Sequence, residues 1–334
     1  MSRHPTPQPK DPDLATLLDR LKRTCDERKK LFPEEADALA RKAVDQVHSN
    51  LQTQAKKPRQ LPLGLLPTDL CRTTWCRPIR PKDMGSADEP KKQVFETSWA
   101  KLTVLGPDCG MKEEDLLIVV LKRWVAQGCR SIQCRYTDLL DDLEYKRSKT
   151  SRHYQSSFRK LKDCLSRLAL TSFILEQPQT KGKILGTVAH VLNLQWNEEK
   201  ETLLINPDPW FAATIGMGFI TGINLEERKK LKGDNAKALH RFLSSQGLTG
   251  HHRTLLLAGA IGMDMTQPEK KLRQNIKVAV SQLKRIGFLL KKTQIRNDIL
   301  HWHRSQHVLS GPSLAKEVQR ISPPASSSQP ASSS

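Results

Sequence analysis

The sequence lacks several features that define common classes of protein. No apolar run approaches the length needed to span a bilayer and no hydrophobic signal region opens the chain, so we expect a cytoplasmic protein that does not insert into a membrane. No Gly-x-x-x-x-Gly-Lys-Ser/Thr loop occurs, which removes the reason to assign ATP hydrolysis. The seven cysteines are odd in number and scattered, so we expect reduced thiols, no disulfide framework, no structural metal and no cofactor.

Acidic residues are scarce relative to basic ones. Among 334 residues, 35 Asp and Glu face 55 Lys and Arg, which gives a formal net charge of +20 at pH 7. Such an excess repels itself unless an anionic surface neutralises it. Nucleic acid is therefore the leading class of partner, and a membrane surface is the weaker alternative.

Tyrosine is also rare, and this bears on one candidate enzyme. His301-Trp302-His303 matches the His-hydrophobic-His metal motif of rolling-circle nicking enzymes, which also need a tyrosine nucleophile. The only three tyrosines are Tyr136, Tyr145 and Tyr154, and all of them lie far from that motif in the sequence. We keep a metal-dependent nicking endonuclease as a minor alternative and expect the two histidines to lie on an exposed strand near DNA phosphate.

A basic amphipathic helix occurs twice in the chain. Its apolar residues recur at spacings of 4 and 3, which place them on one helix face, and Lys and Arg dominate the remaining positions. The two apolar stripes are Leu161, Leu165 and Leu168 in the first copy and Ile276, Val280 and Leu283 in the second. The pattern predicts helices at 111–127, 136–143 and 151–170, and again at 235–246, 254–261 and 267–285.

Each basic helix is followed by short apolar or alternating runs that predict strands. They lie at 173–176, 184–194 and 202–205 after the first helix, and at 288–292 and 298–304 after the second. Three helices and a terminal hairpin is the winged-helix plan, in which the third helix enters the major groove and the hairpin touches the flanking backbone. We therefore expect an α+β protein with two tandem winged-helix domains.

Composition divides the rest of the chain. We expect an N-terminal helical arm at 1–51, a Pro-rich linker at 52–93, the two winged-helix domains at 94–215 and 216–310, and a disordered tail at 311–334. The Gly-rich stretch 216–222 is expected to form the hinge between the two domains.

Helical projection separates inward from outward residues on the two basic helices. Outward positions that mix Lys and Arg with Gln and a small apolar group, here Val278, have the means to hold phosphates and to read base edges. The competing interpretation is a merely solvated cationic face. The candidate DNA-binding residues are Lys270, Lys271, Arg273, Gln274, Lys277, Ser281, Arg285, Lys291, Lys292 and Arg296 in the second module, and Arg152, Gln155, Arg159 and Lys162 in the first.

Several segments resemble one known family. These are Gln60-Leu61-Pro62-Leu63, Leu66 to Arg72, Glu113 to Trp124, Tyr154 to Leu168 and Lys237 to Phe242. Over about residues 60 to 300 the chain resembles the iteron-binding plasmid replication initiators, most closely the TrfA type. The resemblance implies tandem winged-helix domains that bind double-stranded direct repeats, the iterons, at a plasmid origin. It also implies opening of adjacent AT-rich DNA with single-stranded contacts, recruitment of the host initiator and replicative helicase, and a monomer-dimer equilibrium.

The resemblance suggests a second partner for the linker. TrfA-like proteins carry a short Gln-Leu-x-Leu-Phe peptide that docks in the hydrophobic groove of the host sliding clamp. The corresponding partner-binding candidates here are Gln60, Leu61, Leu63 and Leu65, with Gly64 where an aromatic residue is usual. The alternative is an apolar patch that pins the linker onto the first domain.

Three functions remain to be compared. The leading hypothesis is a plasmid replication initiator that binds DNA and has no enzymatic activity. A winged-helix transcriptional regulator shares the expected fold and charge, and the nicking endonuclease comes third.

Overall fold

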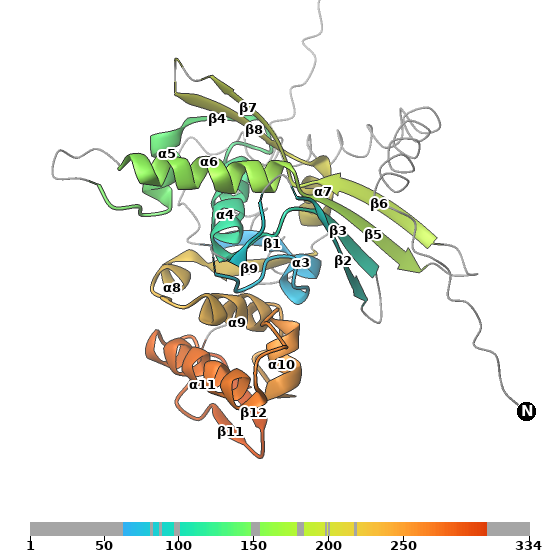
Figure 1. The fold of residues 1–334 in the computed structure, drawn as a ribbon, viewed down its shortest axis with the longest axis vertical. Coiled ribbons are helices and arrows are strands. Elements are labelled where there is room, and N and C mark those ends of the chain that lie inside the picture. The colour runs from blue at the N-terminus through green and yellow to red at the C-terminus, as the bar shows by residue number, and fades with distance from the viewer. Residues whose placement is uncertain are drawn as a thin grey trace, which may run out of the picture. The chain divides into compact units, whose positions relative to one another are not determined.

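The computed structural model contains both helices and antiparallel sheets, which confirms the α+β class (Figure 1). All the residues it describes belong to one compact unit, Ala40–Ser334. The predicted arm, the predicted tail, Gln60, Leu61 and Arg152 lie outside the described residues. Those residues are 63–80, 83–86, 89–96, 101–147, 154–178, 184–197, 199, 201–216 and 219–305.

Two groups of elements share one order along the chain, so the duplication read from the sequence is present in the fold. Each group runs helix, strand, helix, helix, strand, strand, except that the first has two additional strands, at Ser172–Pro178 and Ile184–His190, after its third helix. In each group the first strand pairs with the last. The first group is α4 (Met111–Ala126), β4 (Ile132–Arg135), α5 (Tyr136–Asp142), α6 (Gln155–Ala169), β7 (Leu192–Asn197) and β8 (Thr202–Pro207). The second is α9 (Asp234–Ser244), β10 (Thr249–Arg253), α10 (Thr254–Ala260), α11 (Glu269–Arg285), β11 (Gln294–Arg296) and β12 (Ile299–His303).

The two basic helices bury the apolar stripes that the sequence predicted. Leu161, Leu165 and Leu168 of α6 are buried, as are Ile276 and Leu283 of α11. Full burial of such a side chain contributes roughly 1.5–3 kcal/mol relative to exposure, so the stripe fixes which face of each helix meets the core. Pro268 occupies the N-cap position of α11, and the nearby Thr266 bonds to Asp264.

The strand expected at 173–176 belongs to a sheet that the second group does not have. β5 (Ser172–Pro178) and β6 (Ile184–His190) join β2 (Lys91–Glu96) and β3 (Lys101–Gly106) in a four-stranded sheet of order β2-β3-β5-β6. The hairpin that corresponds to β11 and β12 is β7 and β8, because β4-β8-β7 and β10-β12-β11 have the same order. The apolar runs that directly follow the two basic helices, at 173–176 and 288–292, are therefore not equivalent, and that part of the prediction is wrong.

The strand expected at 288–292 is reduced to a single antiparallel bridge between Leu289 and Arg304. Gly287, with a φ of +84°, turns the chain after α11, and both Phe288 and Leu289 are buried. The Phe288 ring lies 4.5 Å from the ring of His240. Phe288 and Leu289 thus fill the core, and the hydrophobicity of this run alone does not distinguish a core contact from a full strand.

The predicted linker contains a core strand. β1 (Leu63–Pro67) pairs antiparallel with β9 (Ile220–Asn224), and α3 (Thr68–Arg72) follows directly. Leu65 and Leu66 are buried, so the linker interpretation is wrong for these residues and the alternative of a pinned apolar patch describes them. A Cβ on Gly64 would lie 2.0 Å from Cγ2 of Ile118, which explains why no larger residue stands there.

The Gly-rich junction is not a simple hinge. α7 (Pro209–Gly216) precedes it, and Gly222 lies within β9 opposite Leu65. After β9 comes α8 (Leu225–Lys229), whose first turn is capped by the Asn224 side chain, which accepts from the Glu227 amide at 3.2 Å.

A buried ion network joins the first group to the second. The Glu114 carboxylate of α4 is fully buried and accepts from Arg228 at 2.6 Å and from Arg241. The neighbouring Asp115 pairs with Arg228 and with Lys237, each at 2.5 Å. Since α8 and α9 carry the three cations, the two groups share one core across the expected domain boundary.

Candidate nucleic-acid interface

The outward face of α11 is cationic. The helix has one acid, Glu269, in its first turn, and its inward face is taken up by the buried stripe. Val278, on the outward face, is 46% exposed. The predicted contacts that lie exposed on this helix are Lys270, Lys271, Gln274, Lys277, Ser281 and Arg285.

Arg273 differs from the other predicted contacts. Its Nε donates to Oδ1 of Asp298 at 2.9 Å, and its Nη1 pairs with Oε2 of Glu269 at 2.9 Å. The guanidinium is thus shared between two carboxylates, which corrects the expectation that it points freely toward DNA. Hydrogen bonds from Thr254 and then Arg273 hold the pKa of the Asp298 carboxyl below its usual value.

The hairpin β11–β12 is fastened at its turn. Asn297 and Asp298 have φ values of 48° and 62°, as a two-residue type I′ turn requires. Thr254, the first residue of α10, donates its amide to the Asp298 carbonyl at 2.8 Å and its hydroxyl to the Asp298 carboxylate. The turn is therefore fixed to the starts of two helices.

Three further predicted contacts lie around this hairpin. Arg296 is exposed on β11, as expected. Lys291 and Lys292 are exposed but precede β11, in the turn where a strand was expected. Their position places them beside the hairpin and not on it.

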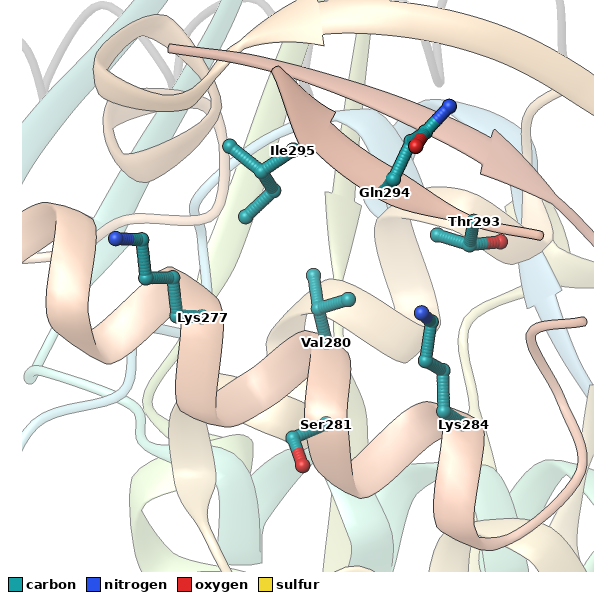
Figure 2. A pocket seen from close by; sticks show the side chains of 7 residues that line it. All are labelled: Lys277, Val280, Ser281, Lys284, Thr293, Gln294 and Ile295. Carbon is teal, nitrogen blue, oxygen red and sulfur yellow. The ribbon is translucent and has the colours of Figure 1, made fainter. Parts of the chain in front are cut away.

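A groove lies between α11 and β11, as Figure 2 shows. Its volume is about 320 Å³. The helix contributes Lys277, Val280, Ser281 and Lys284, and the chain at the start of β11 contributes Thr293, Gln294 and Ile295. Sequence reasoning missed Lys284 and Gln294 as candidate contacts, although Lys284 stands two helical turns after Lys277 on the same face.

The first group offers a weaker cationic face on α6. Gln155 and Arg159 are exposed, as expected, but so is the acid Asp163. The Lys162 ammonium lies 5.4 Å from the centroid of the Tyr136 ring, a cation–π contact that holds it near α5. The two basic helices therefore differ in how many of their cations remain available to a partner.

The histidines of the second sheet lie opposite one another on paired strands. His251 of β10 stands in register with His301 of β12, and their rings stack at 5.9 Å. In the part of the chain that the structure describes, no group of three or more His, Cys, Asp or Glu residues is placed to hold a metal ion. No tyrosine lies on β10, β11 or β12.

The described cysteines carry free, buried thiols, in agreement with the sequence. Burial raises the pKa of Cys71 and of Cys129 to about 12, so these thiols stay protonated and unreactive near neutral pH. Within the described ranges, the structure contains no helix long and apolar enough to cross a membrane.

Comparison with known proteins gives structural likenesses and no family. No family model matches the chain, and no curated protein matches it. Two solved structures, both of domains 2 and 3 of RctB, are similar at 10% sequence identity with a TM-score of 0.46. The match covers 71% of this chain and 96% of the selenomethionine derivative, and 76% of this chain and 99% of the other structure. At this level of similarity neither structure identifies a function.

Proposed function

We propose that this protein is a replication initiator that binds double-stranded DNA in a sequence-specific way and has no enzymatic activity. The observation that carries the proposal is the outward face of α11, where Lys270, Lys271, Lys277 and Arg285 are exposed and the single acid of the helix is neutralised by Arg273. A helix face with several free cations and no free acid suits the phosphate backbone. Gln274 adds a side chain able to pair with an adenine edge.

The order of elements supports the same proposal. In a winged helix, the third helix is the one that enters the major groove, and α11 holds that place in the second group. We therefore propose that both groups are winged-helix domains and that α11 is the principal reading helix. The face of α6, which carries fewer cations, gives the first group a supporting part.

The initiator is favoured over a transcriptional regulator by the family resemblance in the sequence. On that basis we propose that the DNA is a set of plasmid iterons, that adjacent AT-rich DNA opens with host initiator and helicase, and that a monomer-dimer equilibrium controls activity. The clamp contact is left out of the proposal because Leu65 is buried in β1.

Two experiments test the proposal. Gel-shift competition should show that full-length protein prefers the DNA beside its own gene to random duplex. A plasmid carrying only this gene and the neighbouring direct repeats should then replicate. Preferential binding without replication would favour the regulator, and nicking of supercoiled DNA in Mg²⁺ or Mn²⁺ would favour the endonuclease.

A further inference from the structure

The charged side chains that line the groove between α11 and β11 are all cationic. Lys277 and Lys284 lie on its helical wall on either side of Val280, and Ile295 faces them from the hairpin, while the Gln294 side chain at the rim points away from the helix (Figure 2). The two lysines are seven residues apart, so their positions are separated by about 10.5 Å along the helix axis. A linear anionic chain that crosses the groove can therefore meet both.

Among the residues that the structure describes, no ion pair balances the charge of Lys277 or Lys284 in the groove. None of the seven lining residues is acidic. Lys284 Nζ donates to the Lys291 carbonyl at 3.2 Å, and this neutral acceptor does not compensate the positive charge. Two cations that share one groove repel each other, and an anion between them relieves that repulsion.

The hairpin wall of the groove is held in place from outside the groove. The turn at Asn297 and Asp298 is fixed by Thr254 and Arg273, as described above. These contacts use the charge of Arg273 and leave those of Lys277 and Lys284 available. The groove thus keeps its width before any ligand arrives, which lowers the cost of ordering on binding.

We infer that this groove seats a phosphodiester segment of the DNA backbone, with Lys277 and Lys284 as the two charged contacts. The Ser281 hydroxyl adds a neutral donor of the kind that binds phosphate oxygens. The inference rests on the proposed function and makes Lys277 a backbone contact instead of a base-reading one. Bases are then read by the rest of the outward face, around Gln274.

The test measures the salt dependence of binding to a random-sequence DNA duplex, by fluorescence anisotropy with the full chain. Each lost phosphate contact lowers the slope of log K against log salt by about 0.9. Lys277→Ala and Lys284→Ala should each show this loss, and the double variant should lose about twice as much. Lys277→Gln and Lys284→Gln, which keep most of the side-chain volume, should behave in the same way.

Lys230→Ala is the matched control, because Lys230 is exposed in the same half of the chain and lies outside the groove. Its slope of log K against log salt should equal that of the wild type.

A wild type that binds no duplex overturns both this inference and the proposed function. If the wild type binds DNA and both groove variants keep the wild-type slope of log K against log salt, only the groove assignment is overturned. A further experiment adds inorganic phosphate at constant ionic strength and measures how well it competes with the duplex. If phosphate no longer competes in the double variant, but the slope of log K against log salt is unchanged, the groove holds free phosphate and the backbone assignment is wrong.

Discussion

At the scale of single residues, the outward face of α11 carries two kinds of side chain. Several are suited to bind the DNA backbone, and one can read the base sequence. Gln274 is exposed between cationic neighbours and carries both a donor and an acceptor. An amide of this kind forms a bidentate pair with adenine, and phosphate contacts carry no sequence information. Affinity and specificity should therefore respond to different substitutions on one helix.

Replacing Gln274 with Ala should cost about 1–3 kcal/mol on the preferred DNA and little on random duplex, because only a base contact distinguishes the two. Competition gel shifts with both DNAs measure the difference. Gln133→Ala, on an exposed position of β4, should change neither affinity. Equal losses of affinity on both DNAs after Gln274→Ala would show that Gln274 touches only phosphate.

His240 should make the stability of the protein depend on pH. Burial lowers the pKa of this imidazole below its ordinary 6.5, against the opposing effect of a hydrogen bond to Glu227; nearby Arg228 and Arg304 lower it further. The unfolded chain then binds the proton more readily than the folded chain does. The free energy of unfolding should be highest above pH 6.5 and fall as the pH drops from 6.5 toward the lowered folded-state pKa.

Urea unfolding at a series of pH values measures how steeply the free energy of unfolding changes with pH. His240→Asn should flatten this dependence over the same window, although the variant is less stable at neutral pH because it leaves space beside Phe288. An unchanged slope in the variant would assign the pH dependence to other groups.

At the scale of elements, the hairpin β11–β12 depends on a cation that the sequence alone assigned to DNA. Arg273 joins α11 to the turn through Asp298, and Thr254 joins the same turn to α10. Helical projection places Arg273 near the outward face, but projection does not show which partner a side chain takes. The fold brings Asp298, which lies 25 residues further along the chain, next to Arg273 and so determines its partner.

Arg273→Ala should weaken DNA binding severalfold without changing the salt slope, since the charge it removes is already neutralised by Glu269 and Asp298. Asp298→Asn should weaken binding to a similar extent, and the two substitutions together should cost less than their sum because they break one contact. Salt titrations of the four proteins measure both quantities. A slope reduced by about 0.9 in Arg273→Ala would instead identify Arg273 as a phosphate contact.

At the scale of the whole molecule, the two repeated groups are joined through charge as well as apolar packing. Glu114 lies between Arg228 and Arg241 with all three side chains buried, and Asp115 adds Lys237. Such a network need not add net stability, but removing one partner leaves the others buried and unpaired. The strand pair β1–β9 reinforces the same junction.

Glu114→Ala should therefore lower the free energy of unfolding by about 3–5 kcal/mol, because the buried Arg241 loses its carboxylate partner and Arg228 keeps only Asp115. Glu226→Ala is the control, since that carboxylate is largely exposed and pairs with Lys229 at 3.5 Å; it should change stability by less than about 1 kcal/mol. Chemical denaturation of both variants measures the contrast. Similar stability in the two would mean that the junction is held by apolar packing alone.

The sequence by itself determined the elements whose signals are local. The stripes of α6 and α11, the excess of positive charge and the repetition of the helical pattern all follow from spacing and composition, because a helix needs only its own period to define its buried face. Only the tertiary structure decided which strands pair, that Leu65 and Leu66 belong to the core, and that Arg273 serves the hairpin. Each of these depends on contacts between residues far apart in the chain: β1 meets β9, β5 meets β3, and Asp298 meets Arg273. A short apolar run or a single cation has several partners that suit it equally well, and the packing of the whole molecule selects one.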